Sequence, residues 1–136
     1  MQLIEWDERL SVGISAIDDQ HRKLIGMINS LHQAQRLGHE QDVLEGGLDA
    51  VVDYTRRHFA FEEELIASAG YPHLAEHRVL HGNFLAHMEQ FRERGRQASR
   101  AGLTLESMTF LREWLLDHIE GVDQRYAPYV SLAQRS

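Results

Sequence analysis

The side chains with the clearest chemical potential in this sequence are five histidines and two acidic residues spread along the chain. They are His21, His58, Glu62, His77, His81, His118 and Asp123. Imidazole nitrogens and carboxylate oxygens bind transition-metal ions, and the sequence contains no cysteine that could supply a thiolate ligand. If the segments that carry these residues meet, the sequence predicts a site for two metal ions held by nitrogen and oxygen ligands alone.

Two pairs among these residues have helical spacing. His58 and Glu62 are four residues apart, and so are His77 and His81. Residues four apart on an α-helix differ by only about 40° in direction and about 6 Å along the axis, so the members of each pair point the same way. We therefore expect two helices to offer paired ligands to neighbouring metal ions.

The last pair, His118 and Asp123, has a spacing of five and needs a different local structure. On a regular α-helix these two side chains would point about 140° apart and could not converge. A π-bulge, or an unwinding at Gly121, would bring them onto one face. We predict a distortion of the helix between His118 and Val122.

The other four histidines carry less information. A single histidine on a helix is most often a surface residue or a hydrogen-bonded core residue, so we expect surface positions for all four. They are His32, His39, His73 and His87. One alternative stays open, because His73, His77 and His81 form a ladder at a spacing of four. Spacing alone does not decide which two of these three bind metal.

The hydrophobic pattern predicts long helices joined by short turns. We expect three helices at about 17–38, 41–69 and 73–95, and a fourth that begins after residue 102. No stretch of alternating apolar and polar residues predicts a β-strand. Short connections make successive helices antiparallel, so the expected fold is all-α, an antiparallel up-down-up-down four-helix bundle.

The length of the chain predicts a single domain that spans residues 1–136. Within it, residues 1–16 are expected to form an N-terminal arm and residues 17–123 the four-helix bundle. Residues 124–136 would be a short C-terminal segment, packed on the bundle as a second arm.

Composition and charge exclude several classes of protein. Hydrophobic residues make up 43% of the sequence and charged residues 26%, as in an ordinary globular protein. Acidic residues outnumber basic ones by 21 to 14, which argues against nucleic-acid binding because phosphate contacts need a basic surface. The sequence begins with no basic leader and has no apolar run of about 20 residues, so we expect no membrane span and a cytoplasmic location.

Four sequence motifs resemble those of one known family. They are WDERLSVGISAIDDQH at 6–21, HFAFEE at 58–63, YPHLAEHRVLHGNF at 71–84 and WLLDHIEGVDQRY at 114–126. Together they extend over nearly the whole chain, which resembles the bacterial hemerythrins. In that family the ligands of the third segment follow a Tyr-Pro turn and precede a phenylalanine, so the resemblance implies His77 and His81 rather than His73.

The resemblance implies a non-heme centre of two iron ions (Fe2+/Fe3+) with an oxo or hydroxo bridge. The implied ligands are His77, His81 and His118 for one iron, His21 and His58 for the other, and Glu62 and Asp123 as bridges. Three histidines saturate the first iron, whereas two leave an open position on the second. By analogy with the family, dioxygen enters there and stays as hydroperoxide, and nitric oxide or small anions are further ligands of that position.

Apolar residues one turn from the ligands are expected to wall this open position and to exclude water. They are Leu24, Phe59, Trp114, Leu115 and Ile119. No spare histidine, carboxylate or tyrosine is expected in that pocket as a general acid, which favours an oxygen binder over an enzyme. The sequence leaves open which residues hydrogen-bond the ligand histidines, and the candidates are Asp18, Gln20, Glu63 and Glu120.

The function that the resemblance implies is reversible binding of dioxygen, for carriage or storage, without catalysis. The first alternative is a sensor of oxygen, nitric oxide or redox state that acts through a partner protein. A second is a di-iron oxidase or an iron-handling protein of the ferritin-like kind. Such sites use Glu-x-x-His motifs, and this sequence contains none. The recipient of the oxygen and the oligomeric state stay open.

Overall fold

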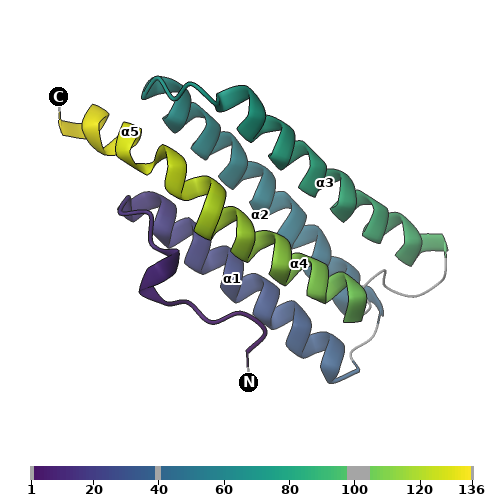
Figure 1. Ribbon diagram of the computed structural model, residues 1–136. Coiled ribbons are helices and arrows are strands. Elements are labelled where there is room, and N and C mark those ends of the chain that lie inside the picture. Colours follow the sequence, from purple (N-terminus) through teal and green to yellow (C-terminus); the bar gives the residue numbers. More distant parts are fainter. Residues whose placement is uncertain (1, 39–40, 98–104, 136) are drawn as a thin grey trace.

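The computed structural model describes residues 2–38, 41–97 and 105–135, and all regular secondary structure within them is helical. Four long helices lie side by side and alternate in direction (Figure 1). They are α1 (Ser15–Arg36), α2 (Gln41–Ser68), α3 (Leu74–Gln97) and α4 (Leu105–Asp117). The prediction of an all-α, up-down-up-down bundle is confirmed. None of the described helices is long and apolar enough to span a membrane.

Two glycines end the first two helices. Gly38 follows α1 with a φ of 71°, and Gly70 follows α2 with a φ of 75°. This left-handed backbone is unfavourable for residues with a Cβ atom but open to glycine, so the sequence stops each helix at a defined point. α1 itself begins at Ser15, two residues before the expected start at residue 17.

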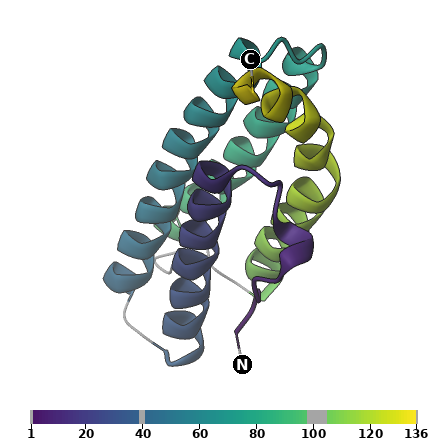
Figure 2. The same cartoon turned by 90° about the vertical axis from the view of Figure 1, so that its left-hand side faces the viewer.

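The end of the chain differs from the arm that we expected. α4 passes into a π-helical turn, η2 (His118–Asp123), and then into α5 (Gln124–Arg135), so that the three form one continuous, curved rod (Figure 2). Tyr126 and Val130 lie four apart on α5, and both are buried. They belong to a second core cluster, whose other members are Val12, Ile14, Ile17, Ile66 and Tyr71. The C-terminal segment is helical because its apolar residues recur at helical spacing.

The beginning of the chain, residues 2–14, forms an arm that lies across α1 and α4 (Figure 2). The backbone N–H of Ile4 donates to Oδ1 of Asn29 at 2.9 Å, and Nδ2 of Asn29 donates back to the carbonyl of Ile4 at 2.8 Å. On the other side, Nε of Arg112 donates to the carbonyl of Leu3 at 3.1 Å. The arm is therefore bonded to both helices.

The arm is held a second time after its short 3-10 helix, η1 (Glu8–Leu10). Asp18 accepts hydrogen bonds from the backbone N–H of Val12 at 2.9 Å and from the hydroxyl of Ser11. Nε2 of Gln124 donates to the carbonyl of Ser11 at 3.0 Å. These bonds tie the end of the arm to both α1 and α5.

The main hydrophobic core fills the space between the four helices. Its most buried members are Ile28, Val51, Phe84, Met88, Met108, Leu111 and Ile119. Burial of each such side chain stabilises the fold by roughly 1.5–3 kcal/mol relative to exposure. The second cluster, around Tyr126, lies at the other end of the bundle from Met108, so buried polar residues between the two clusters are held from both sides.

Candidate metal centre

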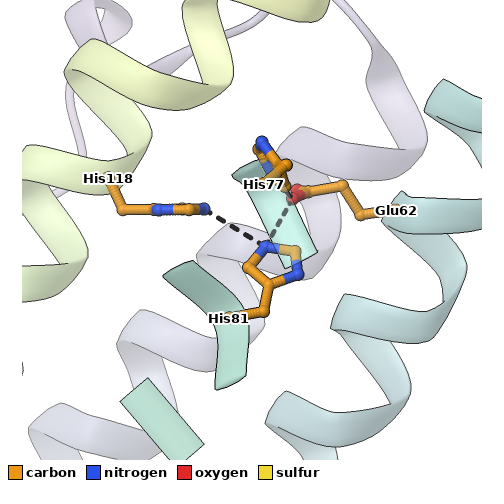
Figure 3. Close-up of side chains that lie close together, drawn as sticks. All are labelled: Glu62, His77, His81 and His118. Carbon is orange, nitrogen blue, oxygen red and sulfur yellow. Dashed lines mark hydrogen bonds and ion pairs between the residues drawn. The ribbon is translucent and has the colours of Figure 1, made fainter. Parts of the chain in front are cut away.

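All seven candidate ligands lie together inside the bundle, and none of them is more than 5% exposed. α1 contributes one, α2 and α3 two each, and η2 the last two; in chain order they are His21, His58, Glu62, His77, His81, His118 and Asp123. Figure 3 shows four of these side chains converging, with His77 and His81 on one side of Glu62 and His118 reaching in from η2. The helical pattern of the sequence thus brings all seven to one place.

The distortion that we predicted after His118 is present. Residues His118–Asp123 form a single π-helical turn between two α-helical segments. The wider π-turn places residues five apart on the same face of the helix. As a result, Nε2 of His118 lies 3.0 Å from Oδ1 of Asp123. The prediction of a distortion after His118 is confirmed, and of the two forms expected the π-helical one is present.

One oxygen of Glu62 and one oxygen of Asp123 together face a group of three histidines. Oε1 of Glu62 lies 2.7 Å from Nε2 of His77 and 3.1 Å from Nε2 of His81. Oδ1 of Asp123 lies 3.0 Å from Nε2 of His118 and 3.3 Å from Nε2 of His77. Nε2 of His81 also lies 3.2 Å from Nε2 of His118. We call this the three-histidine group.

Two histidines face the other oxygen of each carboxylate. Oε2 of Glu62 lies 3.3 Å from Nε2 of His58 and 3.7 Å from Nε2 of His21. Oδ2 of Asp123 lies 3.3 Å from Nε2 of His21. We call this the two-histidine group. Glu62 and Asp123 therefore each turn one oxygen to the three-histidine group and one to the two-histidine group.

This arrangement fits two metal ions. Ligand atoms at roughly 2.0–2.2 Å from one ion lie about 3 Å apart when they occupy neighbouring positions, and most of the contacts above have that spacing. The atoms fall into two groups that share Glu62. Both oxygens of Asp123 are buried without a hydrogen bond. A buried carboxylate in that condition is costly unless a cation satisfies it, so the donor set is suited to metal.

Two of the ligand histidines are oriented by a hydrogen bond on the outer side of the ring. Nδ1 of His58 donates to Oε1 of Gln20 at 2.6 Å, and Nδ1 of His81 donates to Oε2 of Glu63 at 2.7 Å. Glu63 in turn lies 3.3 Å from Nε of Arg78 at the surface. A proton held on Nδ1 leaves the lone pair on Nε2 free to bind metal.

The other two candidates for this role lie elsewhere. Asp18 holds the N-terminal arm, and Glu120 is exposed. Among the described residues, the buried Nδ1 atoms of His21 and His77 have no hydrogen-bond partner. Only some of the ligand histidines are therefore fixed by partners outside the cluster.

Tyr126 is a site residue that we did not expect. Its hydroxyl donates to Oε2 of Glu62 at 3.0 Å, and its ring centroid lies 5.6 Å from that of His77. We named no tyrosine among the candidate site residues because we treated the C-terminal segment as an arm. The signal was available in the sequence, since Asp123 and Tyr126 are three apart and share a face once the helix continues.

The charges in the cluster depend on one another. Burial lowers the pKa of His21, but the carboxylates of Asp123 and Glu62 outweigh it and raise that pKa to about 9. The pKa of His77 is raised to about 9 in the same way. Burial would raise the pKa of Glu62, yet the surrounding histidines hold it well below its usual value. Burial, and then the two carboxylates, raise the pKa of Tyr126, which keeps its phenol neutral. A site that attracts protons this strongly also attracts metal cations.

Aromatic residues of the expected pocket pack on the three-histidine group. The ring of Phe59 stacks on His81 with centroids 3.6 Å apart, and Trp114 stacks on His118 at 4.4 Å. Phe59 also lies 5.9 Å from His58. The remaining pocket candidates, Leu24, Leu115 and Ile119, are buried in the same core cluster. Apolar side chains thus surround the site from the side of the main core.

Burial distinguishes the three histidines of the ladder at the start of α3. His77 and His81 are both 2% exposed and point into the cluster. His73 lies before α3, is exposed, and has Nδ1 3.7 Å from Oε2 of Glu76. His87 is exposed as expected, and His32 is half-buried, whereas His39 lies outside the described residues.

Comparison with known proteins agrees with this geometry. The sequence model of the Hemerythrin HHE cation binding domain matches residues 12–130. The chain belongs to the hemerythrin family. It is 44% identical over 130 residues to the Bacteriohemerythrin of Stenotrophomonas maltophilia, a match that covers 96% of this chain and 83% of that one. The Bacteriohemerythrin of Methylococcus capsulatus is 30% identical over 132 residues, with 96% and 99% covered.

Solved hemerythrin structures have the same fold. A crystal structure of wild-type hemerythrin superimposes with a TM-score of 0.86 at 29% identity, covering 95% of this chain and 98% of that one. A leucine-to-alanine mutant of hemerythrin gives a TM-score of 0.88, with 96% and 99% covered. The resemblance seen in the sequence motifs is therefore confirmed as family membership, and this hemerythrin contains a histidine and carboxylate cluster that fits metal.

Proposed function

We propose that this hemerythrin binds dioxygen reversibly at a pair of iron ions, as a carrier or store of oxygen. The residues proposed to hold the ions are His77, His81 and His118 for one, His21 and His58 for the other, and Glu62 and Asp123 between them. Two ferrous ions, when bound, supply the two electrons that dioxygen binding requires.

The observation that carries the proposal is the unequal number of histidines around shared carboxylates. Oε1 of Glu62 faces His77 and His81 of the three-histidine group, and Oε2 faces both members of the two-histidine group. His118, the third member of the larger group, lies against Oδ1 of Asp123. An ion in the two-histidine group would have one protein ligand fewer, which leaves room for a small molecule. The open position is therefore proposed to lie beside His21 and His58.

The chain's own residues favour binding over catalysis. Five neutral imidazoles stabilise high oxidation states of iron less than a carboxylate-rich set does. Gln20 and Glu63 fix the orientation of two ligand rings. Phe59 and its apolar neighbours keep water away from the site. Tyr126 donates its hydroxyl proton to a hydrogen bond with Glu62, and its raised pKa keeps that proton in place near neutral pH.

The test is a cycle of reduction and oxygenation. The iron-loaded protein is reduced without air, exposed to oxygen, and then placed under vacuum while the visible spectrum is recorded. Carriage or storage predicts a coloured form that appears and disappears over repeated cycles. A single irreversible change to a ferric spectrum would contradict the proposal and favour a sensor or an oxidase.

Two histidine variants provide the matched control. His58→Ala removes a proposed ligand of the iron ion in the two-histidine group. We therefore expect the iron content to fall and oxygen binding to be lost. His87→Ala removes an exposed histidine of α3 whose Nδ1 lies 2.9 Å from the carbonyl of Asn83. Iron content and cycling should be unchanged in this second variant. Equal losses in both variants would rule out the proposed ligand set.

A further inference from the structure

Three of the four tyrosines in the chain follow one another from the candidate metal centre to the surface. The hydroxyl of Tyr126 donates to Oε2 of Glu62 at 3.0 Å. The ring centroids of Tyr126 and Tyr71 lie 6.3 Å apart, and those of Tyr71 and Tyr129 lie 5.2 Å apart. Exposure rises along the series, from 0% at Tyr126 through 7% at Tyr71 to 40% at Tyr129.

The local structure explains how the series is built. Tyr126 and Tyr129 are three apart on α5, so both project toward the same side of that helix. Tyr71 belongs to the turn between α2 and α3 and contacts both rings edge-on. Tyr54, the fourth tyrosine, lies on α2 with its ring 5.0 Å from Nζ of Lys23. Tyr54 packs on the main core, and its replacement is the control for replacements of the other three.

We propose that Tyr126, Tyr71 and Tyr129 form a relay that carries one-electron oxidising equivalents from the loaded metal centre to the protein surface. The inference rests on the proposed function, because a centre that handles oxygen also meets hydrogen peroxide. The benefit is protection of oxidisable side chains inside the bundle, such as the ligand histidines and the buried Met88 and Met108.

The chemistry balances with hydrogen peroxide as the oxidant. Two tyrosines each give up one electron and one proton, the O–O bond breaks, and two water molecules form. Tyr126 passes one electron and one proton to the centre and regains one of each from Tyr71, which regains them in turn from Tyr129. The oxidised site therefore ends at Tyr129, and two Tyr129 radicals account for the two electrons and two protons that one peroxide takes up. Two such Tyr129 radicals on separate molecules couple through a carbon–carbon bond to dityrosine, or a small phenol reduces each of them.

A competing exit begins at Trp114, which stacks on His118 and is also oxidisable. The next rings beyond Trp114 are Phe84 and Phe59, with centroids 4.1 Å and 6.1 Å away. Phenylalanine does not accept an oxidising equivalent under these conditions, so this branch ends at Trp114 itself, which is only partly buried. The tyrosine series differs from it because it begins with a hydrogen bond to the candidate ligand Glu62 and ends at a side chain that is 40% exposed.

The test treats the ferric, iron-loaded protein with hydrogen peroxide. Rapid freezing and electron paramagnetic resonance detect the tyrosyl radical, and dityrosine fluorescence with mass spectrometry detects the covalent dimer. We expect a tyrosyl signal and a dimer linked through Tyr129. Tyr129→Phe should lose the dimer but keep a radical, and Tyr71→Phe should do the same with the radical held at Tyr126. Tyr54→Phe should behave like the unchanged protein.

Several results would overturn the relay. They are a dimer that survives Tyr129→Phe, a dimer lost equally in Tyr54→Phe, or the same radical in protein loaded with zinc, which has no redox chemistry. A tryptophan radical in place of the tyrosyl signal would assign the exit to Trp114. Oxygen cycling of the same sample separates the two proposals. Reversible cycling without a tyrosyl radical would contradict the relay alone. Failure to load two irons, or to cycle, would contradict the proposed function and the relay together.

Discussion

Nδ1 of His81 lies 2.7 Å from Oε2 of Glu63, whereas the corresponding atom of His58 meets the neutral amide of Gln20. A carboxylate acceptor makes a stronger, charge-assisted hydrogen bond and raises the basicity of the imidazole. The three-histidine group therefore has the stronger outer support of the two. Glu63 is only half-buried, so this support extends to the surface through Arg78.

Replacement of Glu63 should weaken metal binding in the three-histidine group. Glu63→Gln keeps the shape of the side chain but removes its charge. We expect the affinity of the three-histidine group for zinc to fall about 10- to 100-fold. Competition with a coloured chelator measures this. Glu64→Gln is the control, because Glu64 is the exposed neighbour on the same helix. Equal affinities for both variants would show that Glu63 does not support the ligand.

The π-turn should be needed for its length and not for its glycine. Deletion of Gly121 would return the segment to α-helical spacing and rotate α5 by about 100°, which carries Tyr126 away from Glu62. We expect lost metal binding and a lower melting temperature. Gly121→Ala keeps the length, and a Cβ atom at this position meets nothing within 4 Å, so metal binding should persist. Loss of metal in the alanine variant would contradict this account.

Phe59 should stabilise both the core and the site. It is 4% exposed and lies parallel to the ring of His81. Phe59→Ala leaves a cavity and should lower the free energy of unfolding by roughly 3–5 kcal/mol, with faster release of bound metal. Phe61→Ala, on the same helix but 41% exposed, should change it by about 0.5 kcal/mol or less. Denaturant unfolding of both variants tests the difference, and similar values would contradict the packing role.

Asp18 should matter for stability rather than for metal. Asp18→Ala removes an ionised acceptor of two hydrogen bonds from the arm, so we expect a loss of about 1.5–3 kcal/mol and a lower melting temperature. Asp19→Ala breaks only an exposed ion pair with Arg22, worth about 0.2–1 kcal/mol. Metal content should be unchanged in both variants. A drop in iron content for Asp18→Ala would give this residue a role that the hydrogen bonds do not predict.

The sequence predicts the candidate ligands better than it predicts the residues that surround them. Pairs on one helix, such as His58 with Glu62, follow from helix geometry, and the five-residue spacing of His118 and Asp123 predicted a distortion of the helix, which is present as the π-turn. Contacts between residues of different helices do not follow from spacing. His58 and Gln20 are separated by 38 positions, and their contact depends on how far each helix is rotated about its own axis. No spacing rule encodes that rotation.

The C-terminal segment was misjudged for a related reason. We treated the last ligand as the end of the bundle, although Tyr126 and Val130 continue the buried face of the rod. The chain continues as a helix because this face covers the second cluster. A residue that bonds Glu62 was missed as a result, which shows that the limits of a motif are not the limits of the element that carries it.

The N-terminal arm affects how far apart two sets of candidate ligands can move. α1 is the first and α4 the last of the four bundle helices along the chain, so no loop joins them. The arm takes the place of that loop, with Asn29 bonded at one edge and Arg112 at the other. α1 carries His21, and the rod that continues α4 carries His118 and Asp123. The first few residues of the chain thereby act as a strap that limits how far these ligands can drift apart.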